Sequence, residues 1–175
     1  MNTQEAQLRV LCLTMNPSVD LATETERVVP THKLRCGDTL HDAGGGGINV
    51  ARVLTRLGGE CTSLCPTGGS AGHWLETRMR EEGIPSVFLP IADETRVSFT
   101  VHEHSTGAEF RFVMPGPHLS EAEWQAALQH LEGLQPFPAI VVASGSLPPG
   151  VPTDFYARLA RLCRAKGARM VLDTS

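Results

Sequence analysis

Four consecutive glycines at positions 44–47 constrain this chain more than any other feature of its sequence. A helix pattern follows at once, with apolar residues at the i, i+3, i+4 and i+7 spacing of one helix face: Val50, Val53, Leu54 and Leu57. Glycines at a helix start let the backbone approach a ligand closely, and the free N–H groups and positive helix end favour an oxygen-rich ligand. We therefore predict a ligand-binding loop here, the plainer alternative being a flexible tight turn.

Two common nucleotide-binding loops are excluded by the neighbouring sequence. The glycines are not followed by the Gly-Lys-Ser/Thr of a Walker P-loop. A dinucleotide-binding fingerprint requires an acidic residue at the end of the second strand, and the strand expected at 61–66 has none. The glycine loop is therefore of another kind.

Strand and helix patterns alternate along most of the chain. Besides the helix after the glycines, helix patterns lie at 68–82, 124–134 and 153–166, and Ser120 and Glu123 predict a capping box before the second of these. An apolar run predicts a strand at 8–14, and further strands are expected at 61–66, 139–144 and 169–173. Such alternation predicts an α/β fold in which helices flank a parallel sheet. We find no linker and no internal repeat, so residues 1–175 are assigned to one domain.

Two more polar segments, 19–42 and 95–113, interrupt this alternation. In the second, Val97, Phe99 and Val101 alternate with polar residues, a turn suits residues 105–107, and alternation then resumes. This pattern predicts a β-hairpin with one polar face. We expect the two segments to pair into a small antiparallel sheet, separate from the parallel one.

Composition narrows the class of protein. Hydrophobic residues make up 41% and charged residues 19%, as in ordinary globular domains. A net charge of -4, with no basic stretch interleaved with aromatics, argues against a nucleic-acid partner. No apolar run reaches the roughly 20 residues of a membrane span, and the N-terminus carries no secretory signal. Five cysteines without a zinc-binding spacing indicate reduced, buried thiols in a cytoplasmic protein.

Polar residues after the first expected strand are candidate ligands. Ser18 and Asp20 are two residues apart, so an extended backbone points both the same way, at the strand end where open α/β sheets bind ligands. An Asx-type turn after Asn16-Pro17 explains these residues equally well. Asn49, a poor helix-interior residue in the first turn of its helix, is a further candidate.

Charged and imidazole side chains suggest further sites. Arg96 and Arg111 lie on the two arms of the expected hairpin, and paired guanidiniums suit a phosphate, although solvated strand arginines are the commoner case. His102 and His104 share a strand face, but no third metal ligand has a suitable spacing. Asp173 ends a parallel strand, which is typical of binding sites and of structural caps alike.

Together these features resemble the ribokinase-like, PfkB-type sugar kinases, from about residue 8 to the end of the chain. The family's first signature is a glycine cluster, then Asn-x-small, then glycines at set distances. Here it reads Gly-Gly-Gly-Gly-Ile-Asn-Val-Ala at 44–51, with Gly58 and Gly68 at the expected spacing. Within the family the chain most resembles the minor, PfkB-type 6-phosphofructokinases, on stretches 44–52, 111–116 and 144–150.

The resemblance implies roles for individual residues. Sugar-binding positions of the family are matched by Ser18, Asp20, Gly44, Gly45, Asn49 and Ser146. Arg96 and Arg111 match lid residues that meet the sugar phosphate, and Lys33 matches a lysine near the transferred phosphate. The polar segments match a β lid that also joins two subunits, so a homodimer through the lid is expected.

One departure from the family pattern bears on activity. The family's catalytic aspartate lies in a Gly-x-Gly-Asp motif of the C-terminal half, beside the ATP site, and this chain contains no such motif. The resemblance thus implies the N-terminal, sugar-binding part of a kinase, inactive without its C-terminal ATP-binding part. That enzyme would use ATP and Mg²⁺ to convert fructose 6-phosphate to fructose 1,6-bisphosphate, a step of glycolysis.

Other substrates and a non-catalytic role stay open. Family members that act on fructose 1-phosphate usually carry a lysine in the glycine cluster, which this chain does not. Tagatose 6-phosphate kinases remain close competitors. A fragment that binds a sugar phosphate or dimerises without catalysis is the alternative from a different class.

Overall fold

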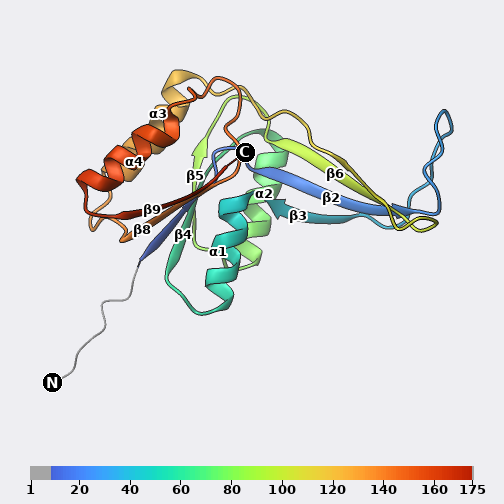
Figure 1. Cartoon of the computed structure of the whole chain (residues 1–175), viewed down its shortest axis with the longest axis horizontal. Helices are drawn as coiled ribbons and strands as arrows, with labels where there is room; N and C mark the ends of the chain where they lie inside the picture. Colours follow the sequence, from blue (N-terminus) through green and yellow to red (C-terminus); the bar gives the residue numbers. More distant parts are fainter. Residues whose placement is uncertain (1–8, 175) are drawn as a thin grey trace.

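Two sheets of different kinds make up the computed structural model, which describes residues 9–174 (Figure 1). The strands of the first sheet are all parallel and in spatial order are Ser86–Pro90 (β5), Cys61–Thr67 (β4), Val10–Leu13 (β1), Ile140–Ser144 (β8) and Arg169–Asp173 (β9). The helices of the described residues are Gly46–Arg56 (α1), Gly69–Glu81 (α2), Glu121–Glu132 (α3) and Phe155–Ala165 (α4). The predicted α/β class, a parallel sheet flanked by helices, is confirmed.

Side chains of the parallel strands alternate between two cores, one on each face of the sheet. Leu13 of β1 packs in a cluster with Trp124 of α3 and Phe155 of α4, while Cys12 beside it packs in the cluster of Ile48 from α1. Figure 1 shows α3 and α4 on one face and α1 and α2 on the other. Burial of both faces explains why the central strands β1 and β8 read as continuous apolar runs, whereas β9 at the sheet edge is mostly exposed.

The cysteines belong mainly to these cores. All five are free, and all except Cys36 are buried. Burial raises the pKa of Cys12 and of Cys65 to about 12, so both thiols stay protonated at neutral pH. The interpretation as structural thiols fits the four buried residues. Cys36 differs because it lies in an exposed loop.

The second sheet, called the lid sheet below, extends sideways from the parallel sheet (Figure 1). Its strands in spatial order are Leu40–Gly44 (β3), Ser18–Thr25 (β2), Arg96–Glu103 (β6) and Glu109–Phe112 (β7). β6 and β7 form the expected antiparallel hairpin, and β2 and β3 also pair antiparallel. The first lid segment runs from Ser18 to Gly44, slightly beyond the predicted 19–42.

The lid sheet is mixed, not wholly antiparallel as predicted, because β2 and β6 run parallel. The reason lies in the strands that precede them. β2 continues from β1 and β6 continues from β5, and these two core strands are parallel members of one sheet. Both lid strands therefore leave the carboxyl edge of the parallel sheet in the same direction.

The sequence analysis did not predict one strand of the parallel sheet, β5. It is an edge strand whose residues are only partly buried, and it ends at Pro90. Prolines are tolerated on edge strands because one side of the strand needs no ladder hydrogen bond. Its apolar run, Val87 to Leu89, is only three residues long and lies between prolines, which is too short to mark a strand.

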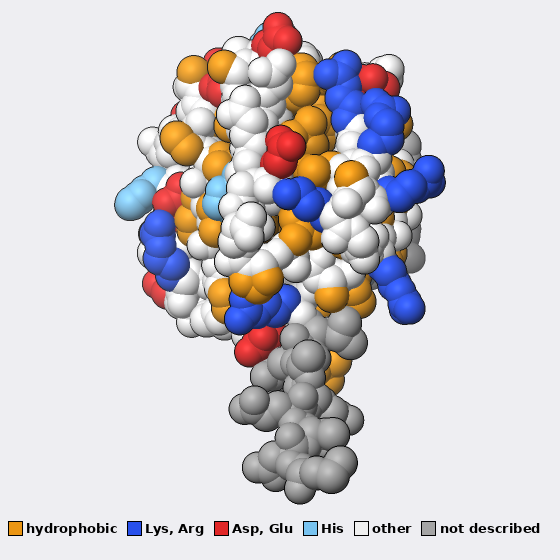
Figure 2. Space-filling model, turned by 90° about the vertical axis from the view of Figure 1, so that its left-hand side faces the viewer, with side chains coloured by type: hydrophobic (Ala, Val, Ile, Leu, Met, Phe, Trp, Pro, Cys, Tyr) orange, Lys and Arg blue, Asp and Glu red, His pale blue; other side chains and the backbone are white. Residues whose placement is uncertain are grey.

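Charged and apolar side chains are mixed on one face of the molecule (Figure 2). On the side away from the lid sheet, Figure 2 shows acidic and basic side chains interspersed with apolar ones. Among residues 9–174, no helix has the length and apolar character needed to cross a membrane.

The capping box predicted at the start of α3 is present and also links this helix to the sheet. Ser120 Oγ accepts a hydrogen bond from the Glu123 amide, and Glu123 Oε2 accepts one from the Ser120 amide at 2.7 Å. Glu123 Oε1 accepts a third from the Ala92 amide, just after β5, at 2.7 Å. Ser120 Oγ also donates a hydrogen bond to Glu123 Oε2 at 2.7 Å, and this bond is the main reason that the pKa of Glu123 is lowered below its usual 4.5.

We expect Ser120→Ala to lower the free energy of unfolding by about 1 kcal/mol, the usual cost of losing an N-cap. Urea unfolding measures it, with the exposed Gln129→Ala of the same helix as a control expected within about 0.5 kcal/mol. A carboxylate whose pKa is lower in the folded state than in the unfolded state stabilises the fold at pH values above its unfolded-state pKa. This stabilisation is lost as the pH falls through the folded-state pKa. The difference between wild type and Ser120→Ala should therefore shrink on acidification; a constant difference would contradict the role of Glu123.

Candidate functional site

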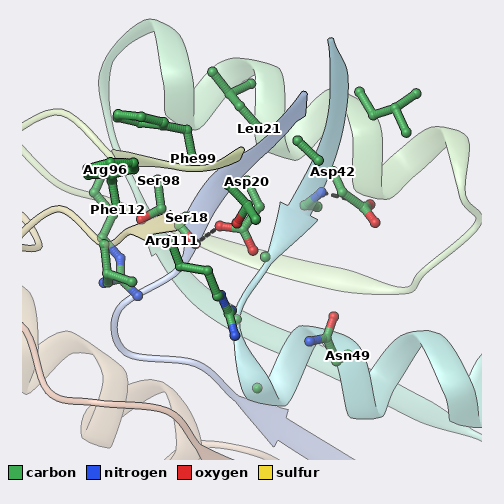
Figure 3. A pocket seen from close by; sticks show the side chains of 18 residues that line it. Ser18, Asp20, Leu21, Asp42, Asn49, Arg96, Ser98, Phe99, Arg111 and Phe112 are labelled. Carbon is green, nitrogen blue, oxygen red and sulfur yellow. Dashed lines mark hydrogen bonds between the residues drawn. The ribbon is translucent and has the colours of Figure 1, made fainter. Parts of the chain in front are cut away.

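A pocket of about 490 Å³ lies where the lid sheet meets the carboxyl edge of the parallel sheet. It is lined by residues of β2, β3, β6 and β7 and by the glycine loop at the start of α1. Figure 3 shows Asp20, Asn49 and Arg111 directed into it from three different elements. Open α/β sheets bind their ligands at this edge.

Most of the residues singled out by the sequence meet in this pocket. Those that line it are Ser18, Asp20, Gly44, Gly45, Asn49, Arg96 and Arg111. Ser146 and Lys33 do not. Ser146 lies to one side, where its Oγ accepts a hydrogen bond from Asn16 Nδ2 at 3.2 Å, and Lys33 is exposed in the loop between β2 and β3.

The glycine loop packs so closely that side chains have no room. A Cβ on Gly46 would lie 2.1 Å from Ser144 Oγ, and one on Gly47 would lie 2.5 Å from the carbonyl oxygen of Leu13. Gly45 has a φ of 130°, a value that residues with a side chain rarely adopt. The glycines are thus explained by close approach and backbone conformation, and not by flexibility.

Asp20 is the carboxylate of the pocket, and its orientation is fixed. Ser18 Oγ donates a hydrogen bond to Asp20 Oδ1 at 2.6 Å. Its other oxygen, Oδ2, faces Gly44, where an added Cβ would come within 2.1 Å. Asp20 pairs across the sheet with Ser98 of β6 and with Asp42 of β3, so these residues form one row on the pocket side.

The two arginines are held in different ways. Arg96 donates through Nη2 to the carbonyl of Asn16 at 3.0 Å and through Nη1 to that of Met114 at 3.2 Å. Partial burial lowers the pKa of Arg96, and the nearby Asp20 carboxylate opposes this shift. The Arg111 side chain makes no hydrogen bond or ion pair within residues 9–174, and Figure 3 shows its guanidinium extending into the pocket. Arg111 therefore has all its N–H donors available for a ligand.

Two pocket residues, Asp42 and Ser98, were missed by the sequence reasoning. Asp42 lies two residues before Gly44 in β3, so both fall on the same strand face, and this spacing was the available signal. Ser98 Oγ is buried without a hydrogen-bond partner in the described part of the chain. A buried hydroxyl without a partner in a pocket wall is available to a polar ligand.

The remaining candidates lie outside this pocket. His102 and His104 have ring centres 5.4 Å apart, and His104 Nε2 lies 3.4 Å from Glu24 Oε2. Within residues 9–174, however, no three His, Cys, Asp or Glu side chains gather as metal ligands. Asp173 accepts a hydrogen bond from Ser144 Oγ at 2.9 Å and so fixes the side chain against which Gly46 packs.

A family model for pfkB family carbohydrate kinases matches residues 13–175, which is most of the chain. The chain belongs to this family. The resemblance inferred from the glycine signature is thereby confirmed, and the pocket described above is the candidate site of a pfkB carbohydrate kinase.

Individual relatives agree with this assignment. The ATP-dependent 6-phosphofructokinase isozyme 2 of Mycobacterium tuberculosis (strain ATCC 25618 / H37Rv) is 49% identical over 171 residues, which are 98% of this chain and 50% of that protein. The 1-phosphofructokinase of Xanthomonas campestris pv. campestris is 36% identical over 169 residues, 96% of this chain and 53% of that protein. The chain thus spans about half the length of the curated relatives it matches.

A solved structure shows the same fold. The crystal structure of phosphofructokinase-2 from Escherichia coli in complex with fructose-6-phosphate superposes with a TM-score of 0.90 at 39% identity. The match covers 96% of this chain and 55% of that one. The parallel sheet together with the lid sheet is therefore the arrangement of a pfkB carbohydrate kinase.

We expect Gly47→Ala to destabilise the chain by about 1–3 kcal/mol, because α1 must move away from β1 to admit the new Cβ. The better helix propensity of alanine, worth at most about 1 kcal/mol, offsets only part of this. Gly133→Ala is the control, since its Cβ would meet no atom closer than 3.4 Å. Equal urea midpoints for the two variants would show that the close packing of the loop is not needed.

Proposed function

We propose that the complete protein is an ATP-dependent kinase that converts fructose 6-phosphate to fructose 1,6-bisphosphate. The observation that carries this proposal is a single pocket that holds both an oriented carboxylate, Asp20, and the guanidinium of Arg111, which has no partner among the described residues. A carboxylate suits sugar hydroxyls and a guanidinium suits a phosphate. The name of the Mycobacterium relative and the ligand in the Escherichia structure support this choice of substrate.

In this proposal the sugar lies along β2 and the glycine loop. Asp20, held by Ser18, accepts hydrogen bonds from sugar hydroxyls, and charge-assisted bonds of this kind contribute about 1.5–3 kcal/mol each. Gly44 and Gly45 let the sugar approach the backbone, and Asn49 adds an amide from α1. Ser146, which accepts a hydrogen bond from Asn16, stays a prediction from the resemblance.

The phosphate of the substrate lies toward β6 and β7. Arg96 is held rigidly by backbone carbonyls, so it provides a fixed positive charge, whereas Arg111 supplies free donors that turn toward the phosphate. Together they neutralise an existing phosphate group. Lys33 remains a prediction: from the loop between β2 and β3, it would approach the transferred phosphate.

ATP and Mg²⁺ are assigned to the part of the longer protein that this chain does not span. The described residues offer no set of three metal ligands, and the sequence has no Gly-x-Gly-Asp for a catalytic base. Mg²⁺ neutralises charge on the phosphates of ATP during such transfers. The residues of this chain bind and orient the sugar, and positioning and electrostatics of this kind account for most of the catalysis of phosphoryl transfer.

A second sugar phosphate is supported by one observation. The 1-phosphofructokinase of Xanthomonas shares 36% identity with the chain, so fructose 1-phosphate is a rival substrate. Tagatose 6-phosphate, the third sugar, is a prediction from the sequence resemblance alone. A coupled ADP-release assay of the complete protein with all three sugars separates them. Preference for fructose 6-phosphate supports the proposal; turnover of none of the three supports a non-catalytic role.

We also propose that two copies associate through the lid sheet. Phe99 and Phe112 border the pocket, but in their strands they alternate with Ser98 and Arg111, so their side chains lie on the other face of the lid sheet. Their rings stack with centroids 4.6 Å apart, and about two-fifths of each residue stays exposed. Val97, on the same face of β6, is 36% exposed. An apolar sheet face of this kind is most readily covered by a second lid.

We expect Asp20→Asn in the complete enzyme to reduce kcat/KM for fructose 6-phosphate by about 10-fold to 150-fold, the equivalent of one charge-assisted hydrogen bond. The Michaelis constant for ATP should change little, because Asp20 lies in the sugar pocket. Asp38→Asn, exposed in the loop between β2 and β3, is the matched control. Steady-state kinetics measure both constants. If kcat/KM for fructose 6-phosphate is unchanged in Asp20→Asn, Asp20 does not bind the sugar.

We expect Arg111→Ala to reduce use of fructose 6-phosphate far more than use of unphosphorylated fructose. The lost guanidinium contacts only the phosphate, and such contacts contribute about 1.5–3 kcal/mol. Arg164→Ala in the last turn of α4 is the control for loss of a surface charge. Equal losses for the two sugars would show that Arg111 has a structural role only.

A further inference from the structure

Arg52 lies outside the pocket lining, but it connects three elements around the pocket. Its Nη1 donates to Asn49 Oδ1 at 2.6 Å, and its Nη2 donates to the Ala43 carbonyl at 2.7 Å and to Asp42 Oδ1 at 3.2 Å. Its Nε donates to Glu82 Oε2 at 2.6 Å. One side chain thus joins α1, the end of β3 and the C-terminal end of α2.

The guanidinium of Arg52 is held firmly. The side chains of Arg52 and Glu82 are each only 11% exposed, so water screens their ion pair weakly. Arg78 Nε lies 3.0 Å from Glu82 Oε1, close enough for an ion pair but not aligned as a hydrogen bond. Glu82 therefore sits between two cations and keeps Arg52 directed toward Asn49.

The contact with Arg52 determines which way the Asn49 carboxamide faces. An arginine side chain only donates hydrogen bonds, so the atom that Nη1 meets must be the amide oxygen. The opposite orientation would place two donors against each other. In Figure 3 the nitrogen of Asn49 points to the side of the pocket where Arg111 lies, and its oxygen points toward Asp42.

We propose that Arg52 is a positioning residue of this site, which fixes the Asn49 carboxamide with its nitrogen toward the pocket. A ligand there meets a hydrogen-bond donor and must present an acceptor, such as a hydroxyl or phosphate oxygen. The identity of that ligand, fructose 6-phosphate, rests on the proposed function. The orientation itself rests on the contacts of Arg52.

The first test uses Asn49→Asp and Asn49→Ala in the complete enzyme. Aspartate keeps an oxygen for Arg52 and places a second oxygen where the nitrogen was. We expect Asn49→Asp to raise the Michaelis constant for fructose 6-phosphate about tenfold, at least as much as Asn49→Ala, with that for ATP nearly unchanged. If Asn49 offers its oxygen to the sugar instead, Asn49→Asp stays near the wild-type value, and the proposal is overturned.

The second test is a double-mutant cycle between Arg52 and Asn49. We expect Arg52→Gln to raise the Michaelis constant for fructose 6-phosphate about fivefold to tenfold in wild type, and to add little in the Asn49→Ala background. Equal factors in the two backgrounds would show that Arg52 does not act through Asn49. Arg56→Gln, exposed in the last turn of the same helix, is the matched control. Assays are run below the melting temperature of every variant, because Arg52→Gln leaves Glu82 without its closest partner.

A third measurement needs no turnover. In ligand-free protein, the side-chain amide signal of Asn49 is identified in a ¹H–¹⁵N correlation spectrum by its loss in Asn49→Asp. We expect Arg52→Gln to shift this signal and Arg56→Gln to leave it in place; no shift with Arg52→Gln overturns the positioning role. Failure of the proposed function would appear separately, as wild-type protein that does not use fructose 6-phosphate.

Discussion

The site depends on close backbone packing between the glycine loop and the end of β1. The Ile48 amide donates to Thr14 Oγ1 at 3.0 Å, and a side chain on Gly47 would meet the Leu13 carbonyl oxygen at 2.5 Å. This approach places the start of α1 directly at the carboxyl edge of the sheet. The helix end with its free N–H groups, the fixed carboxylate of β2 and Asn49 then surround one cavity.

The two faces of the lid sheet differ, and its polar face forms a wall of the cavity. β2 leaves the parallel sheet straight after β1 and carries Ser18 and Asp20 on the pocket side, while β6 brings Arg96 and β7 brings Arg111. Carboxylates and guanidiniums therefore face each other across a space suited to a polar, anionic ligand. On the other face, Val97, Phe99 and Phe112 are partly exposed, which supports the proposal of association with a second lid.

Local patterns were sufficient to predict much of this fold. The helix after the glycines, the hairpin of β6 and β7 and the capping box at Ser120 each depend on spacings of a few residues, and all three are present. The parallel pairing of β2 with β6 was not predicted, because it depends on which edge of the core sheet each strand leaves. β5 was missed because it is a short edge strand bounded by prolines.

The pocket shows the same division between local and long-range information. Asp20 and Asn49 stand out through their neighbours in sequence, and the structure places both in the pocket. Arg52 did not stand out, because its role depends on Glu82, 30 residues away in sequence and at the end of another helix. Ser146 and Lys33 were named by resemblance alone, and the structure places both outside the pocket lining.

The proposed function places a sugar phosphate in this pocket, between the glycine loop and the lid sheet. A crystal structure of the complete protein with fructose 6-phosphate is the sharpest test of this placement. We expect sugar hydroxyls within hydrogen-bonding distance of the Asp20 carboxylate and the phosphate against the Arg111 guanidinium. A fully occupied ligand that touches neither residue would contradict it.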